Sequence, residues 1–178
     1  EFVIGYAGRL VPEKGVGLLL RAAAQLPNTV RVLIAGSGPE QDRLLALAAQ
    51  LGLSDRVTIE TVSSTQMPGF YAQLACLVLP ARTRPNWKEQ FGRVLIEAMA
   101  CGVPVVGSTC GEIPNVIAAA GLVFPEADVT ALAAHLRRLM DDAALREVLA
   151  AKGRAHVLEH YTQKRIAEET VAVYRSLV

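Results

Sequence analysis

Short apolar runs alternate with helical patterns from the first residues of the chain to Phe124. The runs with strand character are Phe2–Gly8, Val30–Ala35, Val57–Ile59, Cys76–Pro80, Val103–Gly107 and Gly121–Phe124. They are apolar at consecutive positions, which is typical of parallel strands that are covered on both faces. The alternation therefore predicts an α/β fold, a doubly wound Rossmann-like parallel sheet of about six strands with helices on both faces.

The segments between these runs supply the helices. We expect helices at Gly15–Leu26, Pro39–Leu51, Gln66–Gln73 and Gly92–Ala100. Pro39 suits the first turn of a helix, and Gly52 is a plausible stop for the same helix. After Asp128 the chain is predicted to be almost entirely helical, with breaks near Asp141–Asp142 and Tyr161–Thr162.

Composition narrows the class of protein. With 178 residues, 52% apolar and 20% charged, we expect one globular domain over residues 1–178. The net charge of +1 gives no general attraction to nucleic acid. No apolar run reaches the roughly 18 residues of a membrane span and we recognise no signal peptide, so we expect a cytoplasmic location. The spacing of the histidines suggests no metal site, and Cys76, Cys101 and Cys110 are predicted to be reduced core thiols.

Loops after the strands carry the candidate chemistry, because ligands of doubly wound sheets bind beyond the carboxyl ends of strands. The first of these loops holds Arg9 and Lys14, two cations five residues apart. Both side chains bind phosphate well, although an ordinary solvated loop also fits them. In the second loop, Gly36-Ser37-Gly38 begins a G-x-G-x-x-G pattern that Gln41 interrupts. A tight strand-to-helix turn is therefore favoured over a dinucleotide site, and backbone lining a nucleotide pocket remains an alternative.

Glu89 and Glu97 flank the start of the fourth predicted helix. They are eight positions apart, which places them about 80° apart around a continuous helix. We therefore predict that Glu89 lies in the loop before the helix and Glu97 within it. The amides of residues 91–94 would be free donors at the helix start, where phosphate binds. Glu89 could alternatively stabilise the helix dipole, whereas Glu97, in apolar surroundings, needs a ligand or a buried cation as its partner.

Taken together, these residues resemble the donor-binding, C-terminal half of retaining GT-B glycosyltransferases of the "group 1" or family 4 type. The resemblance covers essentially the whole chain in order, and its matching segments are residues 8–15, 34–39, 89–106 and 113–123. The glutamate segment with its apolar tail is highly specific for this family, whereas the Gly-Ser-Gly loop alone is not.

The resemblance implies a role for each matching position. Arg9 and Lys14 would be catalytic, because cations stabilise the charge that a departing diphosphate gains. The donor sugar would contact Glu89, Gln90, Phe91 and Gly92. The nucleotide would contact Gly8, Gly36, Thr61, Val62, Val94, Leu95 and Glu97, with Glu97 on the ribose hydroxyls. Such enzymes typically need no bound metal, so we expect no cofactor.

The resemblance also implies a preceding acceptor-binding domain that this chain lacks. We therefore expect the isolated chain to bind a nucleotide-diphosphate sugar and to transfer nothing by itself; peripheral membrane contact of the full protein stays open. Three departures from the family pattern concern the base and sugar pockets, namely Glu60–Val62, Asn115 and Ala118–Ala120. The alternatives are a nucleotide-sugar epimerase half on the same fold and a non-catalytic, transferase-like interaction domain. The sequence does not determine the base, the sugar, the acceptor or the oligomeric state.

Overall fold

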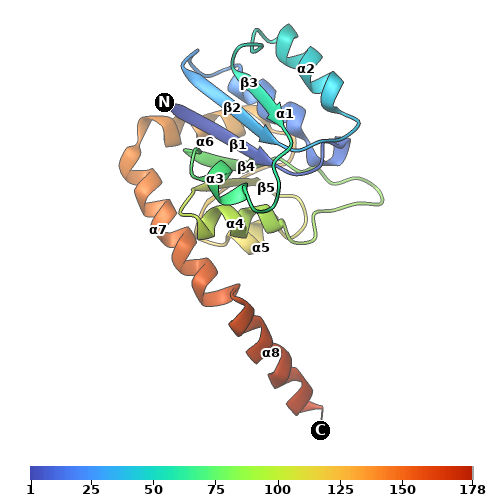
Figure 1. Cartoon of the computed structure of the whole chain (residues 1–178), viewed down its shortest axis with the longest axis vertical. Coiled ribbons are helices and arrows are strands. Elements are labelled where there is room, and N and C mark those ends of the chain that lie inside the picture. The colour runs from blue at the N-terminus through green and yellow to red at the C-terminus, as the bar shows by residue number, and fades with distance from the viewer. Residues whose placement is uncertain (178) are drawn as a thin grey trace.

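The computed structural model describes residues 1–177 and contains one six-stranded, fully parallel sheet (Figure 1). The strands are β1 (Phe2–Ala7), β2 (Val30–Ala35), β3 (Val57–Glu60), β4 (Cys76–Leu79), β5 (Val105–Ser108) and β6 (Leu122–Phe124). Their order is β3-β2-β1-β4-β5-β6, so the chain first moves outward from β1 and later continues from its other side. The prediction of a doubly wound, Rossmann-like sheet is confirmed.

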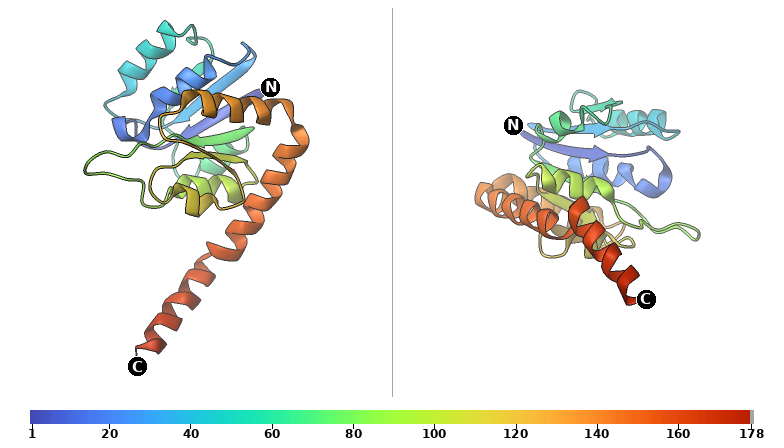
Figure 2. Two further views of the ribbon diagram at one scale, coloured as in Figure 1. Left: turned by 180° about the vertical axis from the view of Figure 1, so that it is seen from behind. Right: turned by 60° about the horizontal axis from the view of Figure 1, so that its bottom comes forward.

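Helices cover both faces of the sheet, which explains the apolar runs. The helices of this body are α1 (Val16–Ala23), α2 (Gln41–Gln50), α3 (Met67–Tyr71), α4 (Arg93–Ala100) and α5 (Ile113–Ile117). Helix α1 packs against α2 and α6 (Val129–Asp141), whereas α4 packs against α5 and α7 (Ala143–His160). Figure 1 shows α3 and α4 in front of the sheet, and Figure 2 shows α1 and α6 from behind. Strands β4 and β5 are consequently buried at every position.

The C-terminal third is helical, with both breaks where they were predicted. The side chain of Asp142 caps α7 by accepting a hydrogen bond from the Leu145 amide at 2.8 Å. Thr162 caps α8 (Gln163–Ser176) by accepting from the Arg165 amide at 3.2 Å. Helix α8 projects away from the body and buries none of its residues (Figure 1). Over residues 1–177, no helix is both long and apolar enough to cross a membrane.

Several details differ from the sequence-based expectations. The fifth strand begins at Val105 rather than Val103, and Pro104, which has no amide, precedes it. Helix α5 and a 3-10 turn at Pro12–Lys14 were not predicted, since five and three residues are too few to show a helical period. Cys76 and Cys110 are buried as predicted, but Cys101, the residue after the end of α4, is exposed.

Candidate functional site

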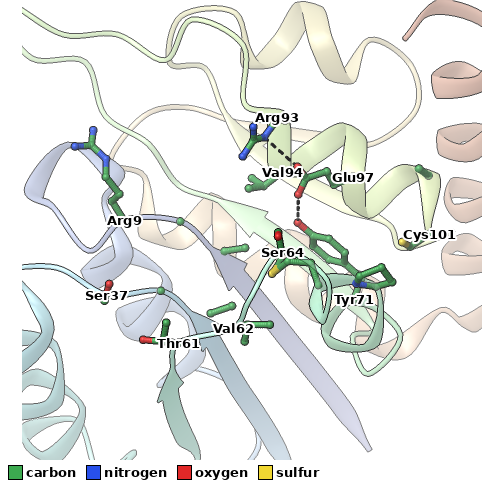
Figure 3. A pocket seen from close by; sticks show the side chains of 17 residues that line it. Arg9, Ser37, Thr61, Val62, Ser64, Tyr71, Arg93, Val94, Glu97 and Cys101 are labelled. Atoms are coloured by element: carbon green, nitrogen blue, oxygen red, sulfur yellow. Dashed lines mark hydrogen bonds and ion pairs between the residues drawn. The ribbon is translucent and has the colours of Figure 1, made fainter. Parts of the chain in front are cut away.

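A cavity of about 620 Å³ opens where the sheet order switches, beyond the carboxyl ends of β1 and β2. It lies between the loops after β1, β2 and β3 on one side and helices α3 and α4 on the other (Figure 3). Its lining residues are Ala7, Gly8, Arg9, Ala35, Gly36, Ser37, Thr61, Val62, Ser64, Met67, Pro68, Tyr71, Arg93, Val94, Glu97, Ala100 and Cys101. Figure 3 shows Arg9, Ser37 and Thr61 on one side and Tyr71, Glu97 and Cys101 on the other.

Two loops joined backbone to backbone form one side of this cavity. The Leu10 amide donates to the Ser37 carbonyl at 2.9 Å, and the Glu40 amide donates to the Leu10 carbonyl at 3.0 Å. A Cβ atom at Gly36 would overlap the carbonyl oxygen of Gly8, so only glycine permits this contact. The Gly-Ser-Gly segment therefore serves as a tight turn, as favoured above, and Gly36 and Ser37 also line the cavity.

The loop that carries Arg9 is fixed from below by Tyr6. The buried Tyr6 hydroxyl donates to the Arg9 carbonyl at 2.9 Å. Burial, followed by the negative charge of Glu89, raises the pKa of Tyr6 well above its ordinary value, so the phenol stays protonated and remains a donor. The Arg9 side chain is exposed and forms no ion pair with any residue in the range 1–177. It is thus available for an anionic ligand in the cavity.

The start of α4 presents backbone donors to the same space. Gly92 caps the helix with φ 77°, a conformation that favours glycine, and no side chain caps this end. Within the described chain, the amides of Arg93 and Val94 make no backbone hydrogen bond. The Leu95 amide, by contrast, donates to the Gly92 carbonyl at 2.8 Å and the residue is fully buried. Arg93 and Val94, both among the expected donors at residues 91–94, thus have amides without a backbone partner in the described chain, whereas the role of the Leu95 backbone toward phosphate stays a prediction.

Glu97 faces the cavity with each carboxylate oxygen in a different contact. Oε2 accepts from the Tyr71 hydroxyl at 2.7 Å, and Oε1 lies 3.0 Å from Nε of Arg93 (Figure 3). Burial and this hydrogen bond raise the pKa of Tyr71 well above its ordinary value. Glu97 thus lies within α4 as predicted, but its partners are a tyrosine and a largely exposed arginine rather than a buried cation.

Lys14 and Glu89 form a second cluster outside the cavity lining. Lys14 Nζ lies 2.5 Å from Glu89 Oε2 and 5.2 Å from the centroid of the Trp87 ring. Glu89 lies in the loop before α4 as predicted, and its carbonyl accepts from the Glu112 amide at 2.9 Å. Phe91 is partly exposed and packs edge-on against Tyr161, with ring centroids 5.6 Å apart.

Of the predicted site residues, the cavity therefore gathers one group and leaves out another. Gly8, Arg9, Gly36, Thr61, Val62, Val94 and Glu97 line it; Lys14, Glu89, Gln90, Phe91, Gly92 and Leu95 do not. No group of three or more His, Cys, Asp or Glu side chains in residues 1–177 is arranged to hold a metal ion.

Comparison with known families identifies the chain. The family model described as "Glycosyl transferases group 1" matches residues 1–156. This chain belongs to the group 1 glycosyl transferases. The resemblance that the sequence carries is thereby confirmed at the level of the family.

Several curated members of the group 1 family are similar to this chain. A D-inositol 3-phosphate glycosyltransferase of Mycolicibacterium smegmatis is 42% identical over 123 residues, 65% of this chain and 27% of the relative. A GDP-mannose-dependent monoacylated alpha-(1-6)-phosphatidylinositol monomannoside mannosyltransferase of Corynebacterium glutamicum is 34% identical over 98% of this chain and 47% of the relative. The group 1 chain thus spans less than half the length of these relatives.

Solved structures share the fold of this group 1 chain almost completely. Sucrose-phosphate synthase from Thermosynechococcus elongatus has a TM-score of 0.89 at 32% identity, covering 99% of this chain and 45% of that one. HepE of Anabaena in complex with UDP has a TM-score of 0.90 at 26% identity, with coverage of 99% and 49%. HepE structures in complex with UDP-glucose, and with UDP and glucose, match equally broadly.

Several residues that line the cavity were not predicted from the sequence. Tyr71, the Arg93 side chain, Ser64 and Cys101 line it without having been predicted as site residues. Tyr71 lies in the short helix predicted at Gln66–Gln73, but nothing in that segment shows that its hydroxyl reaches Glu97, 26 positions later. Only the packing of α3 beside α4 creates this contact.

Proposed function

We propose that this group 1 chain is the donor-binding domain of a retaining glycosyltransferase and that its cavity binds a nucleotide-diphosphate sugar. The observation that carries the proposal is the convergence of three kinds of group on one cavity: the Arg9 cation and the amides at the start of α4, neither of which has a partner within residues 1–177, and the Glu97 carboxylate. A diphosphate requires cations and amide donors, and ribose hydroxyls require an acceptor. The similarity to HepE, whose structures hold UDP and UDP-glucose, supports the same ligand class.

In this proposal the predicted roles divide between the cavity and the neighbouring cluster. Arg9 and the Arg93 and Val94 amides contact the diphosphate, Gly8 and Gly36 allow its close approach, and the base lies against Thr61 and Val62. The donor sugar extends from the cavity toward Glu89 and the backbone of Gln90, Phe91 and Gly92. A sugar hydroxyl then bonds to Glu89, and Lys14 turns from Glu89 to the diphosphate. Arg9 and Lys14 stabilise the charge that the diphosphate gains as its bond to the sugar breaks.

The activity of the whole protein is part of the same proposal. Residues 1–178 form one domain, and a separate acceptor-binding domain completes the active site between the two. The isolated chain therefore binds donor and transfers no sugar. Transfer retains the anomeric configuration. It needs no metal, because side-chain cations and backbone amides neutralise the diphosphate. The mannosyltransferase of Corynebacterium glutamicum is named as GDP-mannose-dependent, whereas HepE was solved with UDP. The nucleotide base is therefore to be identified by measurement.

The test measures thermal unfolding of the chain with UDP, GDP and ADP and their glucose or mannose derivatives. A ligand that binds only the folded state at about 100 times its Kd stabilises it by about 2.7 kcal/mol. Arg9→Ala, Lys14→Ala and Glu97→Ala should each reduce the stabilisation, and EDTA should leave it unchanged. Arg31→Ala is the matched control, because Arg31 lies near the start of β2, at the end of the strand opposite the cavity.

Two results would contradict the proposal. If none of these nucleotides at millimolar concentration raises the unfolding temperature, the non-catalytic interaction domain is the better explanation. Sustained glycosyl transfer by the isolated chain would overturn the role assigned to a separate acceptor domain. The anomeric configuration of the product, read by NMR with the full-length protein, tests retention.

A further inference from the structure

Tyr71 is a buried residue that lines the cavity and contacts Glu97 through its hydroxyl. The residue is 1% exposed, and its ring is held edge-on by Phe70, with centroids 5.8 Å apart. The hydroxyl donates to Glu97 Oε2 at 2.7 Å (Figure 3). A buried ring fixes the direction of this hydrogen bond, so the position of the Glu97 oxygen is fixed from the protein side.

The second contact to Glu97 comes from Arg93 and constrains the carboxylate less than the hydrogen bond from Tyr71 does. Arg93 lies on the other carboxylate oxygen at 3.0 Å, but its side chain is 81% exposed. Ion pairs open to solvent contribute little and hold geometry loosely. The firm constraint on the carboxylate is therefore Tyr71, with Arg93 limiting rotation of the second oxygen.

Glu97 keeps hydrogen-bonding capacity for a ligand. An ionised carboxylate offers about four lone-pair sites, and Tyr71 and Arg93 occupy one on each oxygen. The Glu97 side chain is 35% exposed and lines the cavity, so the remaining sites are open to a ligand there. Burial and the bond to Glu97 keep the pKa of Tyr71 high, so the hydroxyl donates at every physiological pH and cannot exchange roles with the carboxylate.

We propose that Tyr71 is a positioning residue that orients the Glu97 carboxylate toward the two ribose hydroxyls, and that this pair makes the cavity select ribonucleoside over 2′-deoxyribonucleoside diphosphates. The inference rests on the proposed function, because it requires the nucleotide to occupy this cavity. A site built to bond a hydroxyl rejects the analogue that lacks it, since a desolvated polar group then loses its partner. Selection depends on orientation, which is what Tyr71 supplies.

The experiment compares affinities for UDP, GDP and ADP with those for their 2′-deoxy forms by calorimetry. The wild-type chain is expected to prefer the ribonucleotide by roughly 10-fold or more. Tyr71→Phe, which keeps the ring, should reduce that preference by roughly three- to tenfold, and it should weaken 2′-deoxynucleotide binding less than ribonucleotide binding, because the 2′-deoxy forms keep only the 3′-hydroxyl as a partner for Glu97. Glu97→Gln should weaken the preference at least as strongly. Phe70→Leu is the control, because it disturbs packing around Tyr71 without removing a hydrogen bond.

The outcomes distinguish failure of the proposed function from failure of the role of Tyr71 alone. A wild-type chain that binds none of the six nucleotides overturns the proposed function and, with it, the role of Tyr71. A wild-type chain that prefers ribonucleotides, with Tyr71→Phe retaining the full preference, overturns the positioning role alone. Equal weakening of both nucleotide forms in Tyr71→Phe also overturns it, because that is the result of a purely structural tyrosine. If Phe70→Leu loses the preference for ribonucleotides and Tyr71→Phe keeps it, packing around Tyr71 explains the preference. That result also overturns the positioning role.

Discussion

Lys14 and Glu89 form a largely buried ion pair between two loops that are 75 positions apart in the chain. The ammonium and carboxylate are 2.5 Å apart, and the side chains are 18% and 11% exposed. Both residues are proposed to contact the donor, so the pair must loosen when a ligand arrives. Lys14 and Glu89 therefore respond to a ligand together, since a contact to either residue weakens their ion pair.

The first prediction concerns the stability of this pair. Glu89→Gln should lower the free energy of unfolding by about 1–3 kcal/mol, because Lys14 then keeps its charge in a largely desolvated position beside the Trp87 ring, without the carboxylate that pairs with it. Urea unfolding at pH 7 measures the change. The double variant Lys14→Met with Glu89→Gln should recover part of the loss.

An exposed pair on α8 provides the control for that measurement. Arg165 and Glu169 lie 2.8 Å apart with side chains 49% and 59% exposed, so Arg165→Ala should change stability by less than about 0.5 kcal/mol. Equal effects of Glu89→Gln and Arg165→Ala would show that burial adds nothing to the Lys14–Glu89 pair.

The second prediction tests the contact between the first two loops. Gly36→Ala should destabilise the chain by about 2–3 kcal/mol, because its Cβ would overlap the Gly8 carbonyl and force both loops apart. It should also reduce the thermal stabilisation by nucleotides, since Gly8 and Gly36 line the cavity. Gly69→Ala is the matched control, with no atom within 4 Å of the new Cβ and a helical position that favours alanine by about 0.5–1 kcal/mol. A Gly36→Ala chain as stable as Gly69→Ala would contradict the overlap.

The third prediction concerns strain at Ala118. Ala118 has φ 48° and ψ −128°, outside the favoured regions for an L-residue. Ala118→Gly should raise the free energy of unfolding by about 1 kcal/mol, because relief of strain exceeds the added freedom of the unfolded chain. Ala119→Gly next to it, where φ is not positive, should instead lower stability by up to about 1 kcal/mol. Thermal unfolding of the two variants should therefore shift in opposite directions.

The fourth prediction is a loss of stability at high pH. The pKa values of Tyr6 and Tyr71 are raised in the folded state, chiefly by burial, so above about pH 10 the unfolded chain releases phenolic protons that the folded chain keeps. The stabilisation is complete below the ordinary tyrosine pKa and is lost as pH rises above it, by about 1.4 kcal/mol per pH unit for each group. Urea unfolding between pH 9 and 11.5 measures the slope. Tyr71→Phe should remove one group's share of it, and an unchanged slope would contradict the assignment.

The fold could be predicted because the relevant signals are local. Continuous apolar runs mark strands covered on both faces, and side-chain caps at Asp142 and Thr162 mark the helix breaks. Helix α5 escaped prediction because it has five residues and a proline in its first turn. The exposure of Cys101 depends on the end of α4 meeting the cavity, which no periodicity encodes.

The site could be predicted only in part, for a related reason. Arg9, Glu89 and Glu97 each follow a predicted strand in the sequence. Because the carboxyl ends of parallel strands share one edge of the sheet, these positions indicated which loops converge. Which side chains enter the cavity depends on how loops pack: Lys14 turns to Glu89 and Trp87, whereas Tyr71 turns to Glu97. These contacts join segments far apart in the chain and leave no pattern in either segment.

The interlocked loops after β1 and β2 have a consequence for affinity. The Leu10, Ser37 and Glu40 backbone groups are hydrogen-bonded to one another, so the chain itself supplies the contacts that order these loops. The conformational entropy of ordering this side of the cavity is therefore lost when the protein folds and not when a ligand arrives. A small molecule that fits between Gly8 and Gly36 encounters a surface of fixed shape, and its affinity is not reduced by the need to order these two loops.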